Sequence, residues 1–247
     1  MENTLARRVA AEFLGTFLLL MAAGHIFATA GILRLYPQGT NGPVTVGVIN
    51  GVDKLAEAFA VGLVLAVLVV VFGAISGGHF NPAVSLAALL FRGLNPQEFA
   101  AYTFAQIAGG IGGIITAQYL RTGLPSGIAV GKAGMGDPWD YISEFIATLV
   151  LVTVIHATIR AGRAHLVPLA LGGWVVVMVA GMPQGFGNIA VAIATFFSGA
   201  AAPNFGSIAL FVGVQIVAAI GAWVLVSYMY PDDKSAPAPA APSYTTF

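Results

Sequence analysis

The chain has 247 residues, of which 58% are hydrophobic and only 8% are charged, and its formal net charge is zero. No soluble domain of this length has so apolar a composition, so the sequence predicts a polytopic membrane protein. The absence of net charge argues against nucleic acid as a partner. Because the sequence contains no cysteine, disulfides and cysteine metal sites are excluded.

Six long apolar runs are each near the length that spans a bilayer. They cover residues 9–33, 58–75, 99–120, 142–159, 166–182 and 207–230. Arg7 and Arg8 precede the first run, and no small-residue cleavage site is evident. We therefore expect the first run to be a retained span and not a signal peptide.

Two shorter apolar runs, residues 82–91 and 189–197, each follow a Gly-rich stretch. A helix of this length is about 15 Å long, which is half of a hydrocarbon core about 30 Å thick. Asn81 is a favourable N-cap and Pro82 suits the first helical position. Non-helical backbone at membrane depth survives where it is buried in protein or lines a watery cavity. The pattern therefore predicts half-helices whose positive N-terminal ends build a pore or a binding site.

The order long, long, short, long occurs twice along the chain, and the residues support a repeat. Three pairs match in order: residues 11–17 with 143–149, Asn81-Pro82-Ala83-Val84 with Asn188-Ile189-Ala190-Val191, and Gln106 with Gln215. Three spans per copy is an odd number, so the second copy must be inverted in the membrane. The predicted fold is an all-α membrane protein with six transmembrane helices and two re-entrant half-helices.

The predicted organisation is a first repeat in residues 1–120, a connecting loop over 121–141, a second repeat in 142–230 and a disordered cytoplasmic tail over 231–247. Basic residues favour placing both termini in the cytoplasm. The cytoplasmic set would be Arg7, Arg8, Arg92, Arg160, Arg163 and Lys234, and the opposite set Arg34, Lys54, Arg121 and Lys132.

The stretch Ser-Gly-Gly-His-Phe-Asn-Pro-Ala-Val at residues 76–84, the Glu12 segment and the inverted repeat together resemble the aquaporin, or major intrinsic protein, family. The resemblance covers about residues 8–230. It implies two half-helices that meet at their N-termini in mid-membrane, one pore per subunit, usually a homotetramer in the lipid bilayer of a cell membrane, and no cofactor. It also implies that Glu12 and Glu144 anchor the loops before the half-helices, and that the backbone of Gly77, Gly78 and His79 lines the pore.

The two motif asparagines can be argued from their chemistry. A water or alcohol oxygen in a narrow apolar tube needs a donor, and the amides of Asn81 and Asn188 would supply one each. The alternative is that each Asn only caps its helix, although a cap uses the side-chain oxygen and leaves the NH₂ group free. Ile189 stands where the family usually has Pro, so its N–H needs a water or a loop carbonyl. Asn204 is excluded as the second motif because it lies three residues before the last long run.

The chain departs from the family at the outer constriction. Family members that restrict passage usually carry an Arg three residues after the second Asn, and here that position is Val191. Two other constriction positions fall on Val61 and Gly185. The fifth-span position falls between Val176 and Val179, and we take Val176 for it. Without an arginine to donate hydrogen bonds and repel cations, we expect a wide, apolar filter that passes water and glycerol-sized neutral solutes.

Three alternatives to a passive channel stay open at this point. A coupled secondary transporter would need ionisable groups at the midplane, and no Asp lies in any apolar run. An intramembrane serine protease could pair Ser76 with His156. A non-conducting structural family member would also fit the degenerate second motif. Residues 109–113, Gly-Gly-Ile-Gly-Gly, offer a close-packing helix face that could serve the tetramer implied by the family resemblance.

Overall fold

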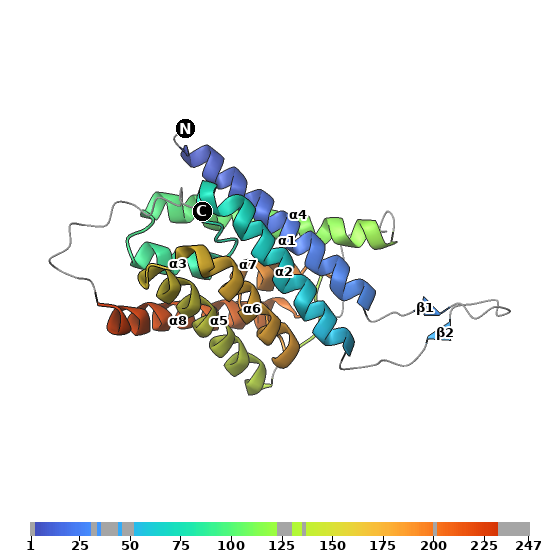
Figure 1. Cartoon of the computed structure of the whole chain (residues 1–247). Helices are drawn as coiled ribbons and strands as arrows, with labels where there is room; N and C mark the ends of the chain where they lie inside the picture. The colour runs from blue at the N-terminus through green and yellow to red at the C-terminus, as the bar shows by residue number, and fades with distance from the viewer. Residues whose placement is uncertain are drawn as a thin grey trace.

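The computed structural model describes residues 3–30, 34–35, 44–45, 52–122, 130–134, 137–199 and 202–231. Its elements in chain order are α1 (Leu5–Ala30), β1 (Arg34–Leu35), β2 (Val44–Thr45), α2 (Val52–Ser76), α3 (Pro82–Leu90), α4 (Pro96–Thr122), α5 (Pro138–Arg160), the 3₁₀ turn η1 (Ala164–Leu166), α6 (Val167–Gly181), α7 (Ile189–Thr195) and α8 (Phe205–Met229). The two strands form a short antiparallel pair that lies beyond the ends of α1 and α2 (Figure 1).

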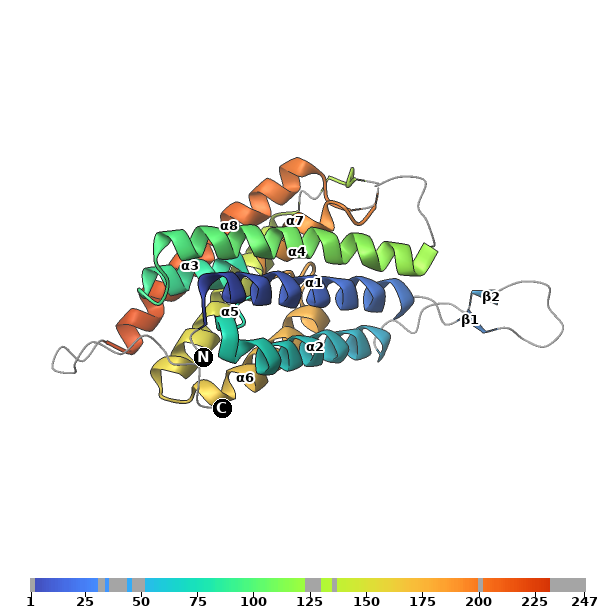
Figure 2. The same cartoon turned by 90° about the horizontal axis from the view of Figure 1, so that it is seen from above.

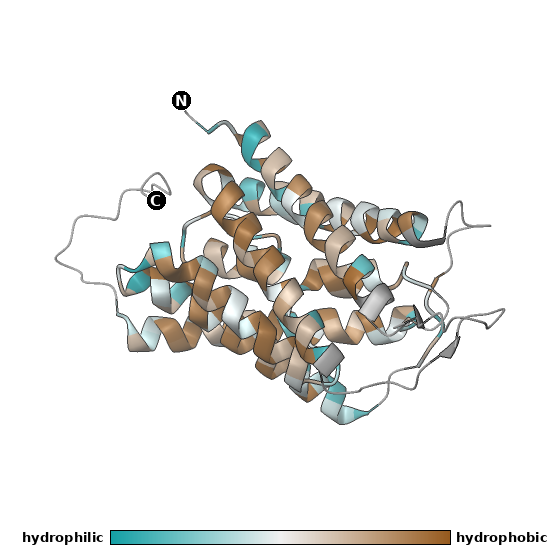
Figure 3. Cartoon of the chain, turned by 45° about the vertical axis from the view of Figure 1, so that its right-hand side comes forward, coloured by the Kyte–Doolittle hydropathy of each residue, from teal (hydrophilic) through white to brown (hydrophobic). Residues whose placement is uncertain are grey.

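Six of these helices are long and apolar enough to cross a bilayer, namely α1, α2, α4, α5, α6 and α8. Apolar residues run along the lengths of the helices, and hydrophilic residues gather near their ends (Figure 3). The helix α1 begins, and α8 ends, at the same end of the bundle (Figure 2). The prediction of an all-α, multi-pass membrane protein is therefore confirmed.

Corresponding helices of the two halves of the chain make corresponding contacts. The helix α1 packs on α4 as α5 packs on α8, and α2 packs against its own counterpart α6. Each half-helix lies against the last helix of the other half, so α3 contacts α8 and α7 contacts α4. This pattern is the inverted repeat that the sequence predicted, and it interlocks the two halves.

The helices α1, α2, α4, α5 and α8 all begin earlier than the apolar runs suggest. In α4 and α5 the cause is a capping residue that starts the helix in polar sequence. In α4, the Glu98 N–H donates to Asn95 Oδ1 at 2.9 Å and the Asn95 N–H donates to Glu98 Oε2 at 3.0 Å, which is a capping box. In α5, Asp137 accepts from the Trp139 N–H at 2.9 Å, and Pro138 takes the first helical position. The expected starts at residues 99 and 142 were therefore late.

The expected connecting loop over 121–141 is shorter in the structure, because α4 runs to Thr122 and α5 starts at Pro138. The half-helices end at Leu90 and Thr195, before the predicted ends at 91 and 197. The boundaries assigned to the two repeats stay a prediction, and the tail beyond residue 231 lies outside the described residues.

The glycine-rich face of α4 packs inside the protomer. A Cβ added at Gly109 would lie 2.4 Å from the Phe13 carbonyl oxygen, and one added at Gly113 would lie 2.3 Å from that of Phe17. Both oxygens belong to α1, so these glycines let two backbones of one chain approach closely. The close-packing face predicted at residues 109–113 is therefore present, and α1 of the same chain covers Gly109 and Gly113.

Candidate pore site

The half-helices α3 and α7 meet in the interior of the bundle, and each starts at its asparagine cap. Asn81 has φ −154° and ψ 118°, and Asn188 has φ −154° and ψ 119°. Asn81 Oδ1 accepts from the Ala83 N–H at 2.9 Å, and Asn188 Oδ1 accepts from the Ala190 N–H at 2.9 Å. The substitution of Ile189 for proline thus leaves the cap geometry of the second motif unchanged.

The two asparagines also bond across to each other's loops. Asn81 Nδ2 donates to the Gly187 carbonyl at 2.8 Å, and Asn188 Nδ2 donates to the Phe80 carbonyl at 2.9 Å. The capping argument led us to expect free NH₂ groups, but each group makes one hydrogen bond to the opposite loop. An amide NH₂ carries two donors, so one N–H of each group holds the loops together and the other is not used by these bonds.

Ile189 uses the N–H that a proline would lack. That N–H donates to Asn81 Oδ1 at 3.4 Å, so the expectation of a water or a loop carbonyl as its partner was wrong. The oxygen of Asn81 therefore receives a hydrogen bond from each half-helix.

The loops before the half-helices share one backbone shape. Gly78 and Gly185 have φ of 60° and 63°, and Phe80 and Gly187 have φ of 48° and 53°. A positive φ is strained for a residue with a side chain, so the second loop has glycine where the first tolerates Phe80. A strained residue persists only where its surroundings fix it.

Glu12 supplies that fixation in the first loop. Its Oε1 accepts from Ser76 Oγ at 2.6 Å and from the His79 N–H at 3.0 Å, while its Oε2 accepts from the Phe80 N–H and from Gln106 Nε2, both at 2.7 Å. Glu12 is fully buried. Its carboxylate therefore satisfies backbone donors that would otherwise be buried without a partner.

Glu144 does the same in the second loop. Its Oε1 accepts from the Phe186 N–H at 2.6 Å, and its Oε2 accepts from the Gly187 N–H at 2.9 Å and from Gln215 Nε2 at 2.8 Å. Both glutamates are thus engaged in holding the loops, and Gln106 and Gln215 occupy equivalent positions in the two halves.

A cavity of about 320 Å³ lies beside the meeting point of the half-helices, and both motif asparagines line it. Its apolar wall comes from α1, α2, α5 and α6, and its polar wall from the two loops. Residues in that wall include Leu20, Val61, His79, Asn81, Leu151, Val175, Met178, Val179, Gln184, Gly185, Asn188, Val191 and Thr195.

Of the four expected constriction residues, Val61, Gly185 and Val191 line the cavity. Val176 does not, because it faces α2, where a Cβ added to Gly62 would lie 2.8 Å from Val176 Cγ2. Val175 and Val179 line the cavity instead. Val176 was therefore the wrong choice within the expected range 176–179, whose other end, Val179, lines the cavity. Every nearby residue of α6 is apolar, so the sequence does not show how the helix is rotated about its axis.

His79 contributes more than its backbone. Its Nδ1 lies 3.0 Å from Ser85 Oγ, which accepts from Gln106 Nε2 at 2.9 Å. The ring also contacts Tyr102 edge-on, with centroids 5.5 Å apart. Sequence analysis missed this side chain and Ser85, although Ser85 lies one helical turn after the Asn81 cap.

The protease alternative does not fit the geometry. Ser76 is buried, its hydroxyl donates to Glu12, and its oxygen accepts from the Gly78 N–H at 3.1 Å. His156 Nε2 has no hydrogen-bond partner among the described residues, so the two do not form a nucleophile and base pair. Ser76 supports the loop.

Six spans, two opposed half-helices and a cavity that both asparagines line define a membrane channel with an aquaporin-like fold. The family model for major intrinsic protein matches residues 1–225, so the chain belongs to the major intrinsic protein family, whose members are channels and not enzymes.

Individual proteins agree with this membership. An aquaglyceroporin, AqpS, of Rhizobium meliloti strain 1021 is 33% identical over 230 residues, which are 92% of this chain and 92% of that protein. A glycerol uptake facilitator protein-like 6 of Lactiplantibacillus plantarum is 31% identical over 67% of this chain and 70% of its own length. The X-ray structure of an aquaglyceroporin from Plasmodium falciparum has a TM-score of 0.58 at 20% identity, covering 92% of this chain and 96% of that one.

Proposed function

We propose that this chain is a passive channel for water and small uncharged solutes up to about the size of glycerol. The observation that carries the proposal is the cavity of about 320 Å³ that both motif asparagines line. No Asp, Glu, Lys or Arg of the described chain belongs to its wall. A wall without ionised groups offers nothing to hold a coupling ion, which disfavours a coupled transporter.

In this proposal, Asn81 and Asn188 each donate their remaining N–H to the oxygen of a passing solute. The positive ends of α3 and α7 meet at the same place and oppose cations. Val61, Gly185 and Val191 set the width at the outer end, where no arginine narrows the opening. The printed names of the two relatives, an aquaglyceroporin and a glycerol uptake facilitator protein, support glycerol-sized solutes.

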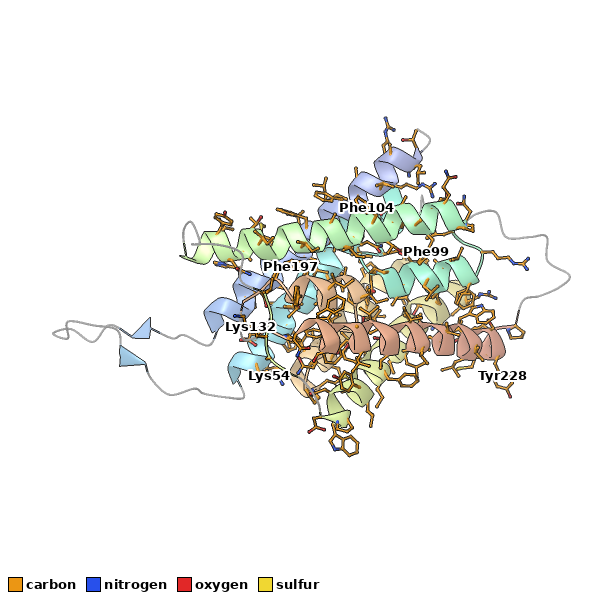
Figure 4. The ribbon with its side chains drawn as sticks, turned by 180° about the vertical axis from the view of Figure 1, so that it is seen from behind. Lys54, Phe99, Phe104, Lys132, Phe197 and Tyr228 are labelled. Atoms are coloured by element: carbon orange, nitrogen blue, oxygen red, sulfur yellow. The ribbon has the colours of Figure 1, made fainter. Side chains whose placement is uncertain are left out.

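We also propose that the protein lies in the cell membrane as a homotetramer with both termini in the cytoplasm. Because α1 begins and α8 ends at the same end of the bundle, both termini would lie on the same side of the membrane (Figure 2). Lys54 and Lys132 both lie toward the end of the bundle opposite Tyr228 (Figure 4). The homotetramer is supported by family membership alone.

The test is a flux panel in proteoliposomes, with water, glycerol and urea followed by stopped-flow light scattering. The wild type should exceed protein-free vesicles for water and for glycerol. Val191→Arg should lower glycerol flux more than water flux, because a guanidinium would narrow the outer end, and Val191→Leu serves as the control for bulk without charge. Strict exclusion of glycerol by the wild type would refute the wide filter, and no flux of any solute would favour a non-conducting family member.

A further inference from the structure

A second, smaller cavity continues the pore toward the end of the bundle where α1 begins. It has a volume of about 40 Å³, compared with about 320 Å³ for the main cavity. Four residues line both cavities, namely His79, Val84, Ile155 and Leu171. These four therefore lie between the two spaces, and we call them the neck. A single water needs on the order of 10–15 Å³ of such volume, so the smaller cavity has room for very few molecules.

The wall of the small cavity contains two histidines, His79 and His156, among mostly apolar residues and glycines. His156 lies on α5 and is 8% exposed, and His79 is 9% exposed. His79 is held through Nδ1 by Ser85. The main cavity contains His79 but not His156, so His156 is a feature of the small cavity alone.

His156 is fixed on one side and unsatisfied on the other. Its ring packs on the ring of Phe91, with centroids 4.7 Å apart, and it hydrogen-bonds the backbone of Val84. Its Nε2 is buried and has no partner among the residues that the structure describes. A buried polar atom without a partner is costly, and its usual explanation is a water or a ligand. A molecule that occupies the small cavity is the available partner.

We propose that the selecting constriction of this channel is the small cavity and its neck, and that His156 is its specificity-determining residue. A neutral hydroxylic solute or a water enters it from the main cavity and donates a hydrogen bond to Nε2 of His156 in place of one to water. This inference rests on the proposed channel function and moves selection away from the outer end, where the side chains of Val61 and Val191 offer no hydrogen bond. Selection then depends on fit in the small cavity and on hydrogen bonding there.

The hydrogen-bonding part is tested by two variants of similar bulk in proteoliposomes matched for inserted protein. His156→Gln keeps a polar group and should conduct water and glycerol like the wild type. His156→Leu should lower both fluxes about 2- to 10-fold, the factor that one net hydrogen bond contributes. If Leu and Gln conduct equally, the hydrogen-bonding role is wrong.

The width part is tested by two alanine variants. His156→Ala should raise the ratio of glycerol to water flux several-fold, whereas Val191→Ala at the outer end should leave that ratio unchanged. The reverse result, with Val191→Ala changing the ratio and His156→Ala not, would overturn the inference. A wild type that conducts nothing would instead count against the proposed function, so the two failures are distinguishable. Should His156→Ala not insert, His156→Ser makes the same space with a smaller loss of polarity and is judged by the same criterion.

Discussion

Gly15 of α1 packs directly against the ring of Phe80 in the first pore loop. A Cβ added at Gly15 would lie 2.0 Å from Phe80 Cε1 and 2.5 Å from two more ring atoms. Ordinary contact begins near 3.4 Å, so Gly15→Ala requires the ring to move by about 1.4 Å. Phe80 is fully buried, and its N–H is bonded to Glu12, so the ring cannot move without moving the loop that carries Asn81.

The expected cost follows from two opposing effects. Overpacking a filled core costs about 1–3 kcal/mol, and replacing a helical glycine by alanine returns about 1 kcal/mol. Gly15→Ala should therefore destabilise the protein by up to about 2 kcal/mol and lower water permeability, because Asn81 follows Phe80. The measurements are the thermal unfolding midpoint in detergent and stopped-flow water flux in proteoliposomes.

Gly173 on α6 provides the matched control, since a Cβ there would meet nothing within 4 Å. Gly173→Ala should be neutral or stabilising and should conduct normally. The double variant Gly15→Ala with Phe80→Leu should recover part of the loss, because leucine is smaller than the ring. Wild-type stability and flux in Gly15→Ala would refute the reasoning, as would equal effects at the two glycines.

Two further substitutions, Glu144→Ala and Asn95→Ala, distinguish a residue that holds the pore loop from one that only stabilises a helix. Glu144→Ala leaves the N–H groups of Phe186 and Gly187 buried and unpaired, each at about 1–3 kcal/mol, so it should lower the unfolding midpoint markedly and abolish water flux. Asn95→Ala removes the α4 cap at a cost of about 1 kcal/mol, and it should lower the unfolding midpoint slightly while leaving the water flux per inserted protein unchanged.

These outcomes can fail in informative ways. A Glu144→Ala protein that conducts normally would mean that the second loop keeps its shape without its carboxylate. A loss of flux in Asn95→Ala at normal insertion would mean that the start of α4 is coupled to the pore.

The parts of the fold that the sequence predicted correctly are those with local causes. Asn81 and Asn188 are caps because their side chains bond the N–H groups of the first helical turn, and that chemistry is readable from a few neighbouring residues. The short lengths of α3 and α7 follow from the ends of their apolar runs. The starts of α4 and α5 were also readable from Asn95-Pro96 and Asp137-Pro138, but apolar content alone places them too late.

The parts that the sequence did not predict depend on rotation and distance. Whether Val175 or Val176 faces the pore depends on how α6 is rotated against α2, and every position nearby is apolar. The Ile189 N–H donates to Asn81, which lies 108 residues earlier in the chain. The small cavity likewise needs α2, α5 and α6 to be placed in space before His156 can be assigned to it.

The crossed bonds between the half-helix loops have a consequence for how the chain is made. Asn81 relies on the Gly187 carbonyl, and α3 relies on α8, which a ribosome synthesises last. A nascent first half already holds the first loop through Glu12 and Gln106 and packs α3 on α4, but it lacks the Gly187 carbonyl and α8. We therefore expect the packing of α3 to be completed only after α8 has been synthesised, when both half-helices dock together. A chain truncated before α8 should leave one face of α3 uncovered.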